Sequence, residues 1–209
     1  MIADSYSLTV KREPRPKPLG RIALVFAGLL MALVAAGCGG SNNGNPDSRL
    51  TLDQAKAPIS GAPPQLAGIR SQASQLLDGG KDAFDARLAQ LRGTPVVVNK
   101  WASWCGPCRF EFPWFQSLAH DRGGRIAFLG VNSNDSSGSA QTFLSELPLP
   151  YPSYSDPDLQ IAQELGGPPQ AMPATAFYDR AGKLAYTHIG QYQSEQQLIA
   201  DVNKYAAGG

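Results

Sequence analysis

The chain has 209 residues with nearly balanced charge: 18 basic and 17 acidic side chains give a formal net charge of +1. This balance argues against both a nucleic-acid partner and a strongly acidic partner. Its three cysteines are too few for a framework of structural disulfides, so the folded part has to depend on an ordinary hydrophobic core.

The first 37 residues have the pattern of an export signal. A basic segment at residues 11–21 precedes an apolar run at residues 22–36, which is shorter than the roughly 20 residues of a membrane-spanning helix. The run closes on Gly37-Cys38, an ending that resembles the lipobox of bacterial lipoproteins, in which the cysteine is lipidated and becomes the new N-terminus. Ala35 stands where that motif usually has Leu, so an uncleaved signal anchor is the alternative. Both interpretations place the chain outside the cytoplasm, tied to a membrane.

Residues 38–62 are expected to comprise the lipidated Cys38 and a flexible tether. Residues 39–48 are polar and rich in Gly and Asn, with almost nothing to bury. Residues 63–209 are long enough for one domain with its own core. We therefore expect a signal peptide at residues 1–37, a tether at residues 38–62 and one domain from residue 63 onwards.

The domain is expected to begin with two helices between residues 63 and 92. Apolar residues at 66–77 recur at spacings of three and four, and a second apolar stripe follows Asp78-Gly79-Gly80. After Gly93, strands and helices alternate, which favours an α/β sheet with right-handed crossovers. The further expected elements are a strand at 96–100, a helix at 109–120, a strand at 125–131, a helix at 139–146, a loop at 147–156, a short helix at 157–165, a hairpin of strands at 174–178 and 183–189, and a last helix from Ser194, opened by a capping box with Gln197.

Cys105 and Cys108 stand three residues apart, where a strand passes into the N-terminus of a helix. Such a pair can close a reversible disulfide and carry two electrons and two protons. The unpaired N–H groups of a helix N-terminus favour the thiolate, so Cys105, at the cap and facing outward, is expected to be the attacking thiol. Cys108 lies one turn further in and is expected to close the disulfide from a shielded position. Gly106 and Pro107 separate them, and proline suits the first turn of a helix.

Two other interpretations of the cysteine pair remain open at this point. It could be a static disulfide that braces a loop, or half of a zinc site. Zinc would need two further ligands, and only His120, His188 and carboxylates are available, without motif spacing. We favour redox chemistry, expect surface or structural roles for both histidines, and expect no metal or other cofactor.

The stretch NKWASWCGPCR at residues 99–109, followed by Glu111-Phe112-Pro113, resembles the active-site block of the thioredoxin superfamily. More narrowly, it is similar to membrane-tethered thiol–disulfide oxidoreductases of the TlpA/ResA type. The resemblance covers residues 93–207. It implies a thioredoxin fold, in which a central mixed β-sheet is flanked by helices, with an inserted helix and strand segment at residues 137–165. The two helices expected at residues 63–92 differ from the strand-rich start common in relatives and are expected to form an N-terminal helical extension. Further blocks that carry the resemblance are Gly130-Val131-Asn132, Tyr151-Pro152, Asp156-Pro157, Met172-Pro173-Ala174-Thr175 and residues 179–183.

The resemblance also assigns roles around the dithiol. It implies that Pro173 is a cis-proline facing the cysteines and that the backbone of Met172 pairs with an incoming chain, although Pro168 and Pro169 compete for the cis position. Trp104, beside the attacking thiol, is expected to shape the surface that partners meet, whereas Trp101 is expected in the core.

Three residues near the dithiol have no settled role in this resemblance. Asn99 stands where thioredoxins have a buried Asp that helps to move the proton of the second cysteine, so that role is missing. Glu111 is the nearest carboxylate, either as a proton acceptor or simply solvated. Lys100 replaces an aromatic residue and is expected to reach solvent at the strand end, although it could raise the local positive potential.

The sequence thus predicts a lipid-anchored, extracytoplasmic thiol–disulfide oxidoreductase that acts on thiols and disulfides of exported proteins. A reductase is favoured because Gly-Pro between the cysteines is the spacer of reducing relatives, and cytochrome c maturation is one pathway that fits. The expected partners are exported proteins and a membrane electron donor, with a monomeric chain. The alternatives are a disulfide-forming oxidase and a tethered binding lipoprotein without enzymatic activity.

Overall fold

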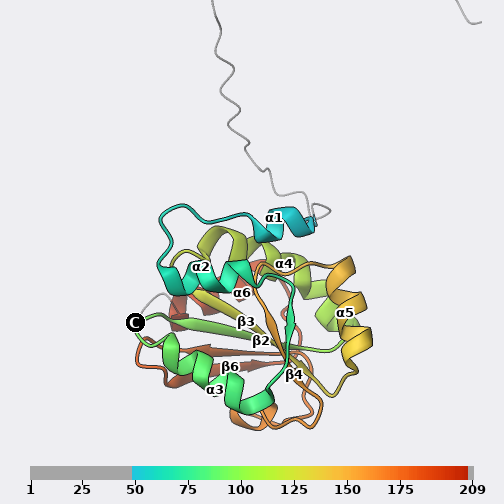
Figure 1. Cartoon of the computed structure of the whole chain (residues 1–209). Coiled ribbons are helices and arrows are strands. Elements are labelled where there is room, and N and C mark those ends of the chain that lie inside the picture. The colour runs from blue at the N-terminus through green and yellow to red at the C-terminus, as the bar shows by residue number, and fades with distance from the viewer. Residues whose placement is uncertain (1–48, 207–209) are drawn as a thin grey trace, which may run out of the picture. The chain divides into compact units, whose positions relative to one another are not determined.

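The computed structural model describes residues 49–206, which form a six-stranded sheet flanked by helices (Figure 1). The strand order is β1-β4-β3-β2-β5-β6; the first three pairings across the sheet are parallel and the last two antiparallel. The elements are α1 (Leu52–Lys56), α2 (Pro64–Ser71), β1 (Leu76–Leu77), α3 (Gly80–Gln90), β2 (Val96–Trp101), α4 (Gly106–Arg122), β3 (Ala127–Ser133), α5 (Ser137–Glu146), β4 (Ser153–Asp156), η1 (Ala162–Glu164), β5 (Ala174–Tyr178), β6 (Leu184–Ile189), α6 (Glu195–Asp201) and η2 (Val202–Ala206).

Helices cover both faces of the sheet: α2, α4 and α6 lie on one side and α3 on the other (Figure 1). Strand β2 sits between β3 and β5, and all six of its residues are buried, as its β-branched run predicts. This arrangement confirms the predicted fold class, including the helix and strand of the insertion, which are α5 and β4. The expected export signal and Cys38 lie outside the described residues.

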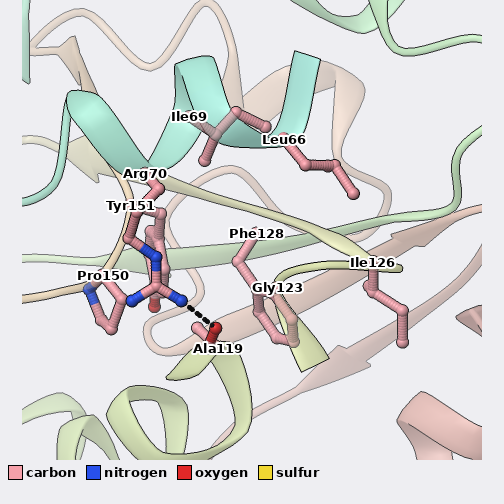
Figure 2. A pocket seen from close by; sticks show the side chains of 9 residues that line it. All are labelled: Leu66, Ile69, Arg70, Ala119, Gly123, Ile126, Phe128, Pro150 and Tyr151. Atoms are coloured by element: carbon pink, nitrogen blue, oxygen red, sulfur yellow. Dashed lines mark hydrogen bonds between the residues drawn. The ribbon is translucent and has the colours of Figure 1, made fainter. Parts of the chain in front are cut away.

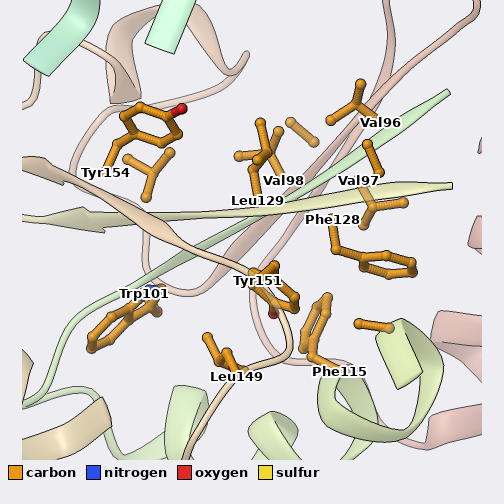
Figure 3. Packing of buried hydrophobic residues seen from close by; sticks show 14 of the residues in the cluster. Val96, Val97, Val98, Trp101, Phe115, Phe128, Leu129, Leu149, Tyr151 and Tyr154 are labelled. Atoms are coloured by element: carbon orange, nitrogen blue, oxygen red, sulfur yellow. The ribbon is translucent and has the colours of Figure 1, made fainter. Parts of the chain in front are cut away.

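Aromatic side chains fill the core between the sheet and helices α4 and α5 (Figure 3). Trp101 is fully buried, with its ring centroid 5.1 Å from that of Phe143 and 5.3 Å from that of Phe112. Its indole N–H donates to Ser153 Oγ over 3.0 Å. Gly130 lies beside this contact, and a Cβ there would fall 2.1 Å from Ser153 Oγ, so only glycine fits. The expectation that Trp101 belongs to the core is confirmed.

Two expectations about local structure at the sheet edge are wrong. Leu76 and Leu77, expected on a helix, form β1 and pair with Ser153 and Tyr154 of β4. The helix ends before them because Ser74 adopts a φ of 58°, a left-handed value. Residues 147–156, whose Pro- and Tyr-rich composition predicts a loop, contain β4, the strand that the resemblance places in the insertion. Two adjacent apolar residues are consistent with either a helix or a strand. Here the unpaired backbone hydrogen-bonding groups of β4 favour a strand.

The expected helix at residues 157–165 is also wrong, since only the 3₁₀ turn η1 forms there. Leu159 has a φ of 62°, which interrupts helical geometry. The carboxylate of Asp156 accepts the N–H groups of Ile161 and Ala162 at 2.9 and 3.0 Å, so a side chain replaces part of the helical hydrogen bonding. At the last helix, Ser194 caps the N-terminus as expected, but Gln197 accepts from Gln193 N–H, so the predicted capping box is incomplete.

The tether expected to run to residue 62 is corrected by α1, which belongs to the folded part. Arg70 of α2 holds it in place, because its buried guanidinium donates to Ala55 O at 3.0 Å. The same guanidinium donates to Ala119 O of α4 at 2.8 Å (Figure 2). Burial lowers the pKa of Arg70. Thr51 and Gln54 add a complete capping box at the start of α1. Between residues 49 and 206, no helix is long and apolar enough to cross a membrane.

Candidate active site

The two cysteines form a disulfide at the N-terminus of α4. Cys105 is the N-cap residue, with φ −84° and ψ 100°, and Cys108 is bonded to it with the Cα atoms 5.3 Å apart. The N–H of Cys108 points at Cys105 Sγ over 3.1 Å. A helix N-terminus presents such N–H groups to negative charge, so the thiolate formed on reduction is stabilised where it is needed.

Both sulfur-bearing residues are shielded in this oxidised form. Cys105 is 4% exposed and Cys108 is 1% exposed, so the expectation of an outward-facing Cys105 is wrong. The Cys105 side chain turns back along α4 because it caps the helix and bonds to Cys108. The exposed residues at this end are Trp104, Gly106 and Pro107, so a partner sulfur has to approach across them.

The segment before Cys105 is fixed by the loop between β3 and α5. Asp135 accepts from the Ser103 N–H at 2.6 Å and from the Ser103 hydroxyl at 2.9 Å. Trp104, 58% exposed, donates its indole N–H to Asn134 O over 2.8 Å. Sequence reasoning missed Asp135, although it follows a buried strand parallel to β2. The carboxyl ends of adjacent parallel strands meet at one edge of a sheet. A polar residue just after β3 could therefore have been predicted to lie near the dithiol, which follows β2.

Pro173 reaches the same edge of the sheet from β5. The Met172–Pro173 peptide bond is cis, and it is the one cis bond in residues 49–206. Ala174, the next residue, pairs with Lys100 near the end of β2, which leads to the dithiol. The Pro173 carbonyl accepts from Gly190 N–H at 2.9 Å. The structure thus places Pro173, rather than Pro168 or Pro169, in the cis position.

Asn99 is buried in β2, the strand that leads to the dithiol, and provides an amide where an acid would titrate. Its Nδ2 lies 3.5 Å from the hydroxyl of Tyr151, and its neighbours across the sheet are Gly130 and Thr175. Burial raises the pKa of Tyr151 above its ordinary value, so this hydroxyl stays protonated at neutral pH. Neither group is therefore suited to take a proton from Cys108.

Glu111 is buried one turn after Cys108, so the interpretation of a solvated side chain is wrong. It is 1% exposed, and its Oε1 accepts from the Tyr192 N–H. Burial raises the pKa of Glu111 to about 7, while the hydrogen bond from Tyr192 acts in the opposite direction. The site therefore contains a carboxyl group that gains and loses a proton near neutral pH.

Lys100 is buried as well, which overturns the expectation that it reaches solvent. Its Nζ donates to Pro169 O over 2.9 Å, so it ties the end of β2 to the segment that leads to Met172. Burial lowers the pKa of Lys100 to about 8, against the attraction of Asp156. Sequence reasoning had no signal for this contact, because its acceptor is a backbone carbonyl.

The histidines lie on β6 and on α4. His188 stacks on Tyr192, with ring centroids 3.8 Å apart, and its Nδ1 is 3.7 Å from Asp201 Oδ2. His120 is exposed near the C-terminus of α4. Within the described part of the chain, no three His, Cys, Asp or Glu side chains gather as metal ligands.

A disulfide that caps a helix, at the same edge of a mixed sheet as a cis-proline, defines the class of protein as a thiol–disulfide oxidoreductase with a thioredoxin fold. The family model described as Redoxin matches residues 66–207, so the chain belongs to the Redoxin family. This membership confirms the resemblance to the thioredoxin superfamily.

Relatives and solved structures agree with this class. The chain is 34% identical over 149 residues to the thiol:disulfide interchange protein HelX of Rhodobacter capsulatus, which covers 70% of this chain and 80% of HelX. It is 35% identical over 103 residues to the thiol:disulfide interchange protein CycY of Rhizobium leguminosarum bv. viciae, covering 49% of this chain and about half (53%) of CycY.

Two solved structures show the same fold over more than half of the chain. A Chlorobium tepidum protein assigned as thiol:disulfide interchange protein DsbE has a TM-score of 0.52 and 29% identity, covering 57% of this chain and 84% of its own. MTB dsbF, solved in mixed oxidized and reduced forms, has a TM-score of 0.51 and 27% identity, covering 56% of this chain and 84% of its own.

Proposed function

We propose that the protein reduces disulfides of exported proteins outside the cytoplasm, with the Cys105–Cys108 pair as its electron carrier. The carrying observation is the disulfide at the N-terminus of α4, where a reduced Cys105 gains stabilisation as a thiolate. A disulfide that only braces a loop does not need to lie at a helix N-terminus. This placement therefore favours redox chemistry over a static disulfide in a binding lipoprotein.

The reaction follows from thiol–disulfide exchange. The Cys105 thiolate attacks one sulfur of a partner disulfide; a mixed disulfide forms and the second partner sulfur leaves as a thiolate. Cys108 then attacks Cys105 Sγ, which releases the first partner sulfur and closes the intramolecular disulfide. Two electrons pass to the partner, and its two sulfur atoms take up two protons in place of the two that the enzyme dithiol gives up, so they end as thiols.

Three neighbours of the dithiol have supporting roles in this proposal. The Met172 backbone, next to the cis bond, pairs with the incoming partner chain. Glu111 accepts the proton of Cys108, because it lies one helical turn away and is buried. Asn99 keeps the floor of the site polar but takes no proton.

The direction of the reaction is proposed from the spacer and the location from the N-terminal sequence. Gly106 and Pro107 form the spacer of reducing relatives, which favours a reductase, with cytochrome c maturation as a pathway that fits. Residues 1–37 act as the export signal, a lipid on Cys38 anchors the monomeric chain, and a membrane protein re-reduces the dithiol. The alternative is a disulfide-forming oxidase.

Trapping tests the exchange chemistry. Cys108→Ser removes the resolving thiol, so mixed disulfides with envelope proteins should accumulate through Cys105, and Cys105→Ser, the matched control, should form none. The wild-type protein should reduce insulin with dithiothreitol as the electron source. If no mixed disulfides are trapped and the wild-type protein does not reduce insulin, the disulfide is a static brace and the proposed redox function is wrong.

Two further measurements separate the finer proposals. Titration of the dithiol against glutathione should give a potential well below that of the glutathione pool for a reductase, and one near or above it for an oxidase. Cys38→Ser should abolish lipid labelling and release the protein from membranes. A Cys38→Ser variant that stays on membranes would point to an uncleaved anchor.

A further inference from the structure

Exposed aromatic side chains gather beside the dithiol. Four large hydrophobic residues are exposed in the described part of the chain, and two of them flank the cysteines in sequence. Isolated exposed apolar residues are ordinary, whereas a cluster at one place marks a contact surface. The four, with their exposed fractions, are Leu52 (43%), Trp104 (58%), Phe110 (56%) and Ile189 (43%).

One of these residues belongs to a ridge on α4, which we define as Pro107, Phe110 and Trp114. Their spacing of three and four residues places them on one stripe of the helix. Phe110 and Trp114 contact each other edge to face, with ring centroids 5.0 Å apart. Pro107 and Phe110 are exposed and Trp114 is half-buried, so the ridge runs from the dithiol along the outside of the molecule.

The flank of α4 that faces α5 carries polar and charged side chains. Between α4 and α5 lies a hollow of about 510 Å³, lined by serines and a threonine, by Arg109 and Glu146, and by Gly138 and Phe143. Arg109 is turned to that side: its Nη1 lies 3.0 Å from Glu146 Oε2, and its guanidinium carbon lies 4.4 Å from the ring centroid of Phe143. No charged side chain stands within the ridge itself, so the two flanks offer a partner different chemistry.

The reaction itself brings a partner onto the ridge. Cys105 is only 4% exposed, so a partner sulfur reaches it only if the partner's surface rests on the residues around the start of α4. Those residues include Pro107, the first member of the ridge. Residues that flank the partner's cysteine therefore meet Phe110 and Trp114, where apolar side chains gain burial and charged ones lose solvation.

We propose that the ridge of Pro107, Phe110 and Trp114 binds apolar side chains that flank the reactive cysteine of the protein partner. This inference rests on the proposed function, since it assigns a surface to the partner of the same dithiol. The ridge makes the enzyme prefer disulfides in apolar surroundings, such as those exposed in partly folded chains. Because Phe110 and Trp114 already pack against each other, little side-chain freedom is lost on binding.

The test compares two synthetic peptide disulfides, one with Leu and Phe beside its cysteines and one with Ser and Asp. The double variant Phe110→Ser, Trp114→Ser should reduce the apolar peptide about tenfold more slowly in kcat/KM than the wild type does. Its rates with the Ser and Asp peptide and with oxidised glutathione should stay within about twofold. Leu52→Ser removes an exposed apolar residue elsewhere and is the matched control, with no change expected for either peptide.

Each other outcome overturns the proposal. If the wild type is active and the double variant keeps the same kcat/KM for the apolar peptide, the ridge does not bind the partner, and the proposed function still holds. If the wild type reduces no disulfide, both the role of the ridge and the proposed function are wrong. If the peptide rates are unchanged while the double variant loses binding to phosphatidylglycerol vesicles, the ridge meets a membrane; if it loses a dimer in light scattering, the ridge meets a second copy.

Discussion

Glu111 combines a buried position with a short path along the helix to Cys108. Burial disfavours the charged carboxylate, and this raises the pKa of Glu111 to about 7. A proton acceptor works best when its pKa is close to the working pH, because it is then partly ionised and still basic. At the residue scale, the burial that makes Glu111 costly for stability makes it suitable for general base catalysis.

Glu111→Gln tests this role, because glutamine keeps an oxygen for the Tyr192 N–H and removes the titrating group. We expect the resolving step, in which Cys108 displaces a peptide from Cys105, to slow about a hundredfold at neutral pH. The wild-type rate should rise through about pH 7 as Glu111 ionises, and the variant should lack this rise. Stopped-flow fluorescence of the preformed mixed disulfide measures both.

Glu146→Gln is the matched control, since Glu146 is an exposed carboxylate on the neighbouring α5. It should leave the rate and its pH dependence unchanged. If Glu111→Gln retains the wild-type pH profile, the proton of Cys108 goes elsewhere and Glu111 has only a structural part.

The reacting cysteines could be predicted from the sequence, but the burial of Glu111 and of Lys100 could not. The pairing of Cys105 with Cys108 follows from their spacing, because the disulfide closes within one turn, and their place at a helix start follows from the strand-like run before them and the helical stretch after them. The burial of Glu111 and Lys100 depends on Tyr192 and Pro169, which come from segments about 70 to 80 residues further on. No local pattern carries that information.

At the scale of elements, prediction succeeded where a segment was long and strongly patterned. Strands β2 and β3 and helices α4 and α5 form within a few residues of the expected bounds, since their apolar runs or helical spacing extend over several residues. It failed at β1, which has two residues and forms because β4 offers open hydrogen-bonding groups. Short elements at sheet edges are decided by tertiary pairing rather than by their own sequence.

The connection from β3 to α5 acts as a support for the active site, and Asp135 is its centre. Its carboxylate accepts from the backbone and hydroxyl of Ser103, from Asn132 Nδ2 and from the Ser136 N–H, at 2.6 to 2.9 Å. Each such bond joins the loop to itself or to the segment before Cys105. Losing the carboxylate that these charge-assisted and mostly part-buried hydrogen bonds share would leave the donor groups without it.

Asp135→Ala should therefore lower the free energy of unfolding by about 3 kcal/mol, measured by urea denaturation of the oxidised protein. The indole of Trp104 should lose its fixed contact with Asn134, which fluorescence anisotropy would detect as faster motion. Asp158→Ala, at an exposed carboxylate in the loop after β4, should change stability by less than about 0.5 kcal/mol. Equal losses in the two variants would show that Asp135 has no special supporting role.

At the scale of the whole molecule, the fold class followed from the alternation of strands and helices, but the extent of the folded part did not. The sequence places α1 in a flexible tether because the polar, Gly-rich residues 39–48 precede it and the first helical pattern begins only at residue 63. Its attachment depends on Arg70, whose guanidinium links α1 to the C-terminal end of α4 through two carbonyls. A buried arginine that satisfies backbone carbonyls of two elements leaves no periodic trace in a sequence.

The two buried ionisable groups near the dithiol give the whole molecule a pH-dependent stability. Glu111 holds its proton up to about pH 7 in the folded state but only up to about its model value of 4.5 when unfolded, so stability falls as pH rises between these values. Lys100 loses its proton at about 8 when folded and at 10.5 when unfolded, so stability rises with pH across that second interval. Together the two groups lower stability most between about pH 7 and 8.

Glu111→Gln and Lys100→Met should each remove one limb of this profile. The free energy of unfolding of Glu111→Gln, relative to that of the wild type, should rise by roughly 3 kcal/mol between about pH 4.5 and pH 7. That of Lys100→Met, relative to the wild type, should fall by a similar amount between about pH 8 and 10.5. Urea unfolding of the oxidised proteins at several pH values measures both differences, in which the other titrating groups cancel. Glu146→Gln and Lys183→Met, at exposed side chains, are the matched controls for loss of a charge. Parallel curves for Lys100→Met and wild type would mean that the ammonium of Lys100 stays charged in the folded protein, held by Pro169 O and Asp156.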